Sequence, residues 1–212
     1  MVRRRAFVGC VGCVAAVLAL GCASEPAELI TDDDLVGVTT TTGTGAPIAP
    51  ATECTITRGD ARARPGTHVA TCSDVAYGTR PPSIGPHYGT WADFRAYDAP
   101  VPWGFVVHSL EHGAVVLAYD CPSGCPELVA SLRAFVDAYP GDARCSGTGA
   151  RARFIVMPAR DLGAPVAAAA WGKIYRATCF DETSLRAFVD ETYARSPEDL
   201  CAPGVDLSGG WC

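Results

Sequence analysis

The sequence predicts an α+β domain with two helices packed on one face of a mainly antiparallel sheet, stapled by disulfides. β-prone apolar runs and two amphipathic stretches follow one another in the order β-β-α-β-β-α, which favours this class. Eight cysteines lie after position 53, and the first 21 residues have the character of an export signal. An oxidising compartment is therefore expected, and with it disulfides.

The individual elements are read from hydrophobic spacing. Two β-prone runs joined by five residues that end in a glycine predict a hairpin. Apolar residues at a spacing of three to four predict two amphipathic helices, the first beginning at a proline and ending before Pro140-Gly141. The predicted strands are 103–108, 114–119, 152–157 and 166–175, the predicted helices are 126–139 and 181–193, and residues 54–102 are expected to be rich in loops, with no element between 79 and 102.

The predicted helices share a heptapeptide. S-L-R-A-F-V-D occurs at 131–137 and again at 184–190. It indicates either a duplicated β-α unit or two helices of similar composition.

The N-terminus predicts export and a lipid anchor. Residues 1–21 form a signal peptide, because an arginine-rich start precedes 16 uncharged residues, fewer than the roughly 20 needed to cross a membrane. Leu18-Ala19-Leu20-Gly21-Cys22 resembles a bacterial lipobox, so Cys22 is the expected lipidation site and the membrane the expected partner. Because Ala23 follows it and not an aspartate, we expect the outer membrane. An ordinary signal peptide is the alternative, and 4–8 also resembles a twin-arginine signal.

Residues 22–53 are predicted to be a lipidated, flexible tether. Beyond Val38 the stretch has one large apolar side chain, Ile48, too little to offset the entropy of ordering the chain. The folded domain is then 54–212. Without residues 1–21 the formal net charge changes from −6 to −9, and one lysine, Lys173, remains. Such a chain is not expected to bind nucleic acid, since it lacks a basic patch.

The eight cysteines of the domain predict up to four disulfides. They allow 105 pairings, among which the sequence alone does not choose. Cys54 with Cys72 and Cys201 with Cys212 are candidate local pairs. A metal site at C-P-S-G-C is disfavoured by the oxidising compartment. The cysteines are Cys54, Cys72, Cys121, Cys125, Cys145, Cys179, Cys201 and Cys212.

Three of the four histidines suggest a metal site. On a straight strand His108 and His112 would lie about 13 Å apart, but on a helical turn or across a tight hairpin they would come within about 5–6 Å. The β-prone flanks favour the hairpin. With Glu111 between them, and His87 completing the set, the residues suit a zinc or copper ion. Alternatively, the pair only hydrogen-bonds within a turn. His68 is expected at the surface.

The same residues fit a second pattern. His108 to His112 read H-x-x-E-H, the inverted zinc-protease signature, in which Glu111 would be catalytic and activate water. A distal glutamate would be the third ligand, and Glu182, Glu191 and Glu198 are the candidates. The β-like flanks and the small domain argue against this alternative.

The motifs P-P-S-I-G-P-H over 81–87 and H-S-L-E-H-G over 108–113, with Ala170-Trp171-Gly172, make the chain resemble the family of unknown function DUF3105. The resemblance implies no activity. It implies that His87, His108, Glu111 and His112 belong to one site, with Glu111 a ligand, a base or an orienting residue, and Tyr88, Trp91 and Trp171 as cleft walls. The alternative is a cell-envelope binding module without enzymatic activity, in which the histidines only fix the hairpin.

Overall fold

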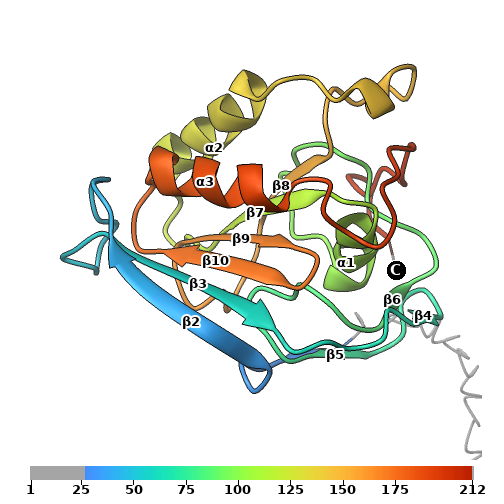
Figure 1. Cartoon of the computed structure of the whole chain (residues 1–212), viewed down its shortest axis with the longest axis horizontal. Coiled ribbons are helices and arrows are strands. Elements are labelled where there is room, and N and C mark those ends of the chain that lie inside the picture. The colour runs from blue at the N-terminus through green and yellow to red at the C-terminus, as the bar shows by residue number, and fades with distance from the viewer. Residues whose placement is uncertain (1–26, 212) are drawn as a thin grey trace, which may run out of the picture.

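The computed structural model describes residues 27–211, and in that part of the chain a six-stranded sheet is the centre of the fold (Figure 1). The strands lie in the order β2-β3-β10-β9-β7-β8, and two short two-stranded sheets, β1-β5 and β4-β6, lie beside it. The elements are β1 (Glu28–Ile30), β2 (Leu35–Thr42), β3 (Thr55–Ala61), β4 (His68–Val69), β5 (Val75–Tyr77), β6 (His87–Tyr88), α1 (Trp103–Glu111), β7 (Val115–Tyr119), α2 (Pro126–Ala138), a 3-10 turn (Ala143–Cys145), β8 (Phe154–Pro158), β9 (Val166–Ala170), β10 (Lys173–Ala177) and α3 (Glu182–Thr192).

The α+β class is confirmed in outline, but the sheet is mixed and not mainly antiparallel. β7 and β8 are parallel, because α2 carries the chain back across the sheet between them. The strand predicted over 166–175 is in fact two antiparallel strands, β9 and β10. The chain reverses at Trp171-Gly172, where Gly172 has a φ of +70° that favours glycine.

The two predicted helices do pack on one face of the sheet. Val115 and Leu117 of β7 join the core under α2 and α3, whereas Val116 and Ala118 point to the opposite core. This alternation is the two-residue period of a strand buried on both faces. α1 and the loops before it cover the second face (Figure 1).

The predicted strand at 103–108, and with it the hairpin around the histidines, is wrong. These residues form α1, and all nine residues of that helix are buried. A helix enclosed on every side has no solvent-exposed face, so its sequence lacks the contrast that reveals a helical period, and its β-branched residues resemble a strand. Its first turn is bound by a side chain from far away, since the Trp103 amide donates to the Glu28 carboxylate at 2.5 Å.

The predicted flexible tether is also wrong over the residues that the structure describes. β1 pairs with β5, and the threonine-rich β2 pairs with β3 as an edge strand of the main sheet. Backbone pairing and the β propensity of threonine order a strand that buries few side chains. Asp181 also accepts hydrogen bonds from the amides of Thr44 and Gly45. The domain therefore begins well before residue 54.

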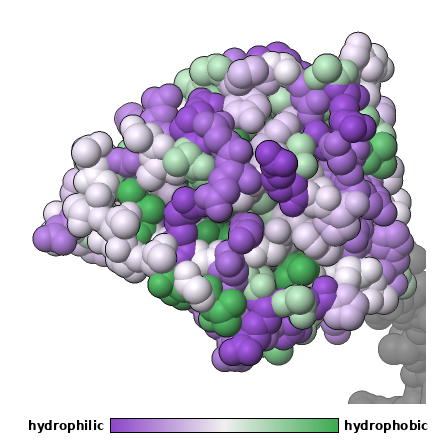
Figure 2. All heavy atoms as spheres, in the orientation of Figure 1, coloured by the Kyte–Doolittle hydropathy of each residue, from purple (hydrophilic) through white to green (hydrophobic). Residues whose placement is uncertain are grey.

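The signal peptide 1–21, the lipidation of Cys22 and the start of the tether lie outside the described residues. Between residues 27 and 211, no helix has the length and apolar character needed to span a membrane. The face drawn in Figure 2 is largely hydrophilic, with apolar residues in small separate groups.

Disulfides are confirmed, but neither local pairing is. Cys54 is bonded to Cys179 and Cys201 to Cys145, so the expected partners of Cys54 and Cys201 are wrong. The third bridge joins Cys121 to Cys125 across the turn before α2. Cys72 is also disulfide-bonded, and Cys212 lies outside the described residues. The Cys54–Cys179 and Cys145–Cys201 bridges join segments that are neighbours only in the folded chain.

Candidate metal centre

All four histidines of the chain converge at the C-terminal end of α1. The rings of His68, His87 and His108 form a triangle with centroid separations of 4.8 to 4.9 Å. The ring of His112 lies 4.6 Å from that of His108. With the Glu111 carboxylate, His68, His87 and His108 bring four ligand atoms within 4.8 Å of one another. This group is the candidate metal centre.

Helix α1 supplies two of the four groups. His108 and Glu111 are three residues apart, so they lie on the same side of one helical turn. The helix packs closely against β6, where a Cβ on Gly104 would lie 2.5 Å from the Tyr88 ring. Only glycine allows this approach, which brings the backbone of Tyr88 up to His108.

The orientation of His87 and His108 is set by backbone carbonyl groups. Nδ1 of His87 lies 3.0 Å from the Gly85 carbonyl oxygen, and Nδ1 of His108 lies 2.6 Å from that of Tyr88. A carbonyl oxygen can only accept, so each Nδ1 carries a proton and donates it. In a neutral imidazole the lone pair is then on Nε2. Metal-binding histidines in proteins are commonly held in this way.

The lone pair of His87 has no hydrogen-bond donor. Its Nε2 is buried without a hydrogen-bond partner, although it lies 3.0 Å from a carboxylate oxygen of Glu111, itself an acceptor. Burial lowers the pKa of both His87 and His108 and raises that of Glu111. Neutral imidazoles and a carboxylate that face one another without a proton donor are a suitable ligand set for a cation.

His112, predicted to be a ligand, is not one of the four. Its Nε2 lies 3.1 Å from the Glu198 carboxylate, and its Nδ1 is buried without a partner. The less costly tautomer therefore has its proton on Nε2, directed at Glu198, which leaves no lone pair there for an ion. Burial, followed by the neighbouring histidines, lowers the pKa of His112 to about 4.

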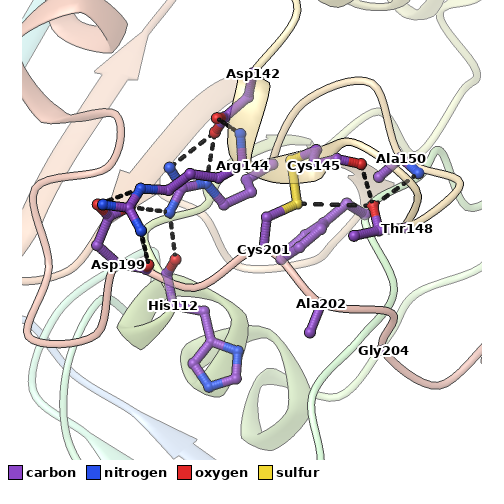
Figure 3. The surroundings of a disulfide bond; sticks show 12 residues. His112, Asp142, Arg144, Cys145, Thr148, Ala150, Asp199, Cys201, Ala202 and Gly204 are labelled. Atoms are coloured by element: carbon purple, nitrogen blue, oxygen red, sulfur yellow. Dashed lines mark hydrogen bonds and ion pairs between the residues drawn. A yellow bond between two sulfur atoms is a disulfide. The ribbon is translucent and has the colours of Figure 1, made fainter.

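A buried arginine fixes the polypeptide around His112. Arg153 donates to the His112 carbonyl oxygen at 2.9 Å and to Asp199 at 2.7 Å. Figure 3 shows the carbonyl of His112 facing this network, close to the Cys145–Cys201 disulfide, and its imidazole pointing away. The Glu198 amide donates to the Glu111 carbonyl oxygen at 3.1 Å. The segment after α3 is thus bound to the end of α1.

Two of the three expected aromatic walls lie beside the site. The rings of Trp91 and His108 are 5.2 Å apart, and those of Trp171 and His87 are 6.0 Å apart. Tyr88 is not a wall, because its ring is buried in the core and its hydroxyl donates to Ser73. Its contribution is the carbonyl group that orients His108.

His68, expected at the surface, is the ligand candidate that sequence reasoning missed. Its side chain is 57% exposed, but β4 pairs in parallel with β6 and places His68 directly opposite His87. Two residues of pairing leave no pattern in the sequence. The only available signal was that the chain has four histidines, so His68 was the one histidine left outside the predicted site.

The fold and the site together define a disulfide-stapled α+β domain with a candidate centre of three histidines and one glutamate. The model of the family described as "Protein of unknown function (DUF3105)" matches residues 68–203, and the chain belongs to that family. The matched range contains every residue of the candidate centre. Comparison with curated proteins and with solved structures gives no match.

Proposed function

We propose that this protein is an exported lipoprotein of the cell envelope, anchored through Cys22 in the outer membrane, that binds one zinc or copper(II) ion. The proposed ligands are His68, His87, His108 and Glu111. The observation that carries the proposal is the pair of Nδ1–carbonyl hydrogen bonds at His87 and His108, because they leave both Nε2 lone pairs for a cation beside Glu111.

The donor atoms favour particular ions. Imidazole nitrogens with a carboxylate oxygen suit zinc and copper(II), whereas copper(I) prefers thiolate or thioether sulfur. Met157 is buried in the hydrophobic core and lies outside the group, and the described cysteines form disulfides.

One contact supports the zinc-protease alternative, but the arrangement of His112 and Glu111 opposes it. Glu198, a candidate distal ligand, does lie beside His112, whereas Glu191 pairs with Arg58. However, that arrangement needs the Nε2 lone pair of His112 and leaves Glu111 free to activate water. Against this alternative, the Glu111 carboxylate lies within 4.8 Å of the ligand atoms of the candidate centre. The favoured tautomer of His112 also directs its Nε2 proton at Glu198.

The test is elemental analysis of the full chain, exported to the periplasm, extracted in detergent and purified without a histidine tag. We expect about one zinc or copper ion per chain, and loss of it in His87→Ala and in His108→Ala. His112→Gln is the matched control, and it should keep the ion because His112 is not a ligand. Circular dichroism checks that each variant is folded.

Glu111→Gln separates the metal hypotheses. We expect it to weaken ion binding by more than the about 10–100-fold that loss of an outer hydrogen bond costs. The protease alternative expects zinc to stay bound and peptide cleavage to stop. A wild-type chain that holds no ion, even after reconstitution, would leave the binding-module alternative, in which the histidines only stabilise the fold.

A further inference from the structure

The four candidate ligands differ in how firmly the protein holds them. His87 and His108 are buried and have Nδ1 fixed by carbonyl groups, and Glu111 extends from a buried helix. His68 is more than half exposed, and no hydrogen bond fixes its ring among the described residues. Its Nε2 is 3.9 Å from the Glu111 carboxylate, compared with 3.0 Å for His87. Three ligands are therefore preformed, and one is loosely held.

The loosely held ligand belongs to an exposed segment, residues 62–71, which we call the strap. From Arg62 to His68 every residue is exposed. The strap is anchored at its ends, by β3 on one side and by disulfide-bonded Cys72 on the other. At its start, the Arg62 amide donates to the Asp34 carbonyl oxygen, and the Arg64 side chain forms an ion pair with Asp34. Beyond Arg64, its backbone contacts with the core are the two-residue β4–β6 pairing and the bond from the His87 amide to the Thr67 carbonyl oxygen.

The strap lies directly over the candidate centre. A Cβ on Gly66 would be 2.6 Å from a carboxylate oxygen of Glu111 and 3.0 Å from the Trp171 ring. The backbone at Gly66 thus covers the carboxylate and closes the site on the side of His68. Lifting the strap would remove His68 and uncover Glu111 together, but would leave His87 and His108 in place.

We infer that the strap is a ligand-carrying lid: the ion binds first to His87, His108 and Glu111, and His68 then closes over it. This inference rests on the proposed function. Closing is coupled to binding, because His68 contacts the ion only when the strap is closed. By linkage, the factor by which closure raises the affinity for the ion equals the factor by which the ion favours closure. Access of any further ligand to the ion is then controlled by the strap.

Limited trypsin digestion of the full chain tests the coupling. The bond after Arg62 lies in the strap, and mass spectrometry can quantify the new N-terminus at Ala63. Zinc, and in a second series copper(II), should slow this cut by about 5–150-fold, the usual range of such couplings, provided that opening is fast relative to cleavage. Cleavage after the exposed Arg160, in the loop after β8, is the internal control and should not respond to the ion.

Two variants complete the design. His68→Ala should still bind the ion, but with an affinity lower by the factor by which the ion slows cleavage of the wild-type chain. In this variant the rate of cleavage after Arg62 should be the same with and without the ion. His87→Ala should lose the ion and be cut at the metal-free rate. The inference is overturned if the wild-type chain binds the ion but is cut equally fast with and without it, or if His68→Ala keeps full protection. A wild-type chain that binds neither ion overturns the proposed function as well.

Discussion

At the scale of single residues, two carbonyl groups decide what the histidines can do. Gly85 and Tyr88 accept from Nδ1 of His87 and His108, whereas Nδ1 of His112 meets no acceptor. The same side chain thus has opposite tautomers four positions apart in the sequence. His108 offers a lone pair and His112 offers a proton. Spacing alone treats the two residues as equivalent, which is why His112 was predicted to be a ligand.

Burial of neutral histidine predicts a dependence of stability on pH. The pKa of His112 is about 4 in the folded protein, compared with 6.5 for an exposed histidine in the unfolded chain. As the pH falls, the unfolded chain therefore protonates this imidazole before the folded protein does. The contribution of neutral His112 to the free energy of unfolding is therefore fully present above pH 6.5 and is lost progressively as the pH falls to 4. His87 and His108 act in the same direction. Glu28, whose pKa burial raises to about 7, and Glu111 act in the opposite direction.

A difference measurement isolates this effect. Urea unfolding of the metal-free wild-type protein and of His112→Gln is compared between pH 7 and pH 4. We expect the wild-type protein to lose about 1–3 kcal/mol of unfolding free energy more than the variant over this range. Parallel pH curves for the two proteins would show that the imidazole of His112 is not buried in neutral form.

At the scale of elements, the sequence predicted the two amphipathic helices but not the enclosed helix α1 or the exposed strand β2. α2 and α3 each have a polar side facing solvent, so their apolar stripes were visible at a spacing of three to four. α1 is enclosed on all sides, and β2 is mostly exposed. Both lack the contrast between a solvent-exposed face and a buried face that produces a periodic pattern of apolar residues. The element that carries His108 and Glu111 was therefore mistaken for a strand.

Asp181 joins the start of α3 to the N-terminal segment. Its carboxylate caps the helix by accepting from the Ser184 amide and also accepts from the amides of Thr44 and Gly45. Asp181→Ala removes all of these acceptors, so we expect a loss of about 2 kcal/mol, at the upper end for a helix cap. The measurement is urea unfolding. Asp190→Ala, at an exposed position of the same helix, is the matched control and should change little. Equal losses of unfolding free energy in the two variants would mean that the hydrogen bonds of Asp181 do not hold the N-terminal segment against α3.

At the scale of the whole molecule, the disulfides whose two cysteines the structure describes differ in reach: two link distant segments and one is local. Cys54–Cys179 links positions 125 residues apart, and Cys121–Cys125 links positions four apart. The chain-entropy relation gives a stabilisation of about 5 kcal/mol for the first and about 2 kcal/mol for the second. Replacing each pair by alanine should reproduce that order in urea unfolding.

The Cys145–Cys201 bridge spans an intermediate separation of 56 residues and serves as the third point of the series. Its loss should cost about 4 kcal/mol. If the three double variants lose the same stability, the bridges act through native contacts and not through the entropy of the unfolded chain.

The sequence by itself determined the family, the mixture of helices and strands, and the use of cysteine for disulfides. It also predicted that His87, His108 and Glu111 come together, as they do in the candidate centre. These follow from local motifs and from periods that a half-buried element must show. The tertiary structure alone decided that α1 is a helix, which cysteines pair, and that His68 replaces His112 in the candidate centre. The physical reason is that each depends on contacts between segments far apart in the chain. The pairing of β4 with β6 and two carbonyl groups place the ligands, and neither leaves a pattern in the residues themselves.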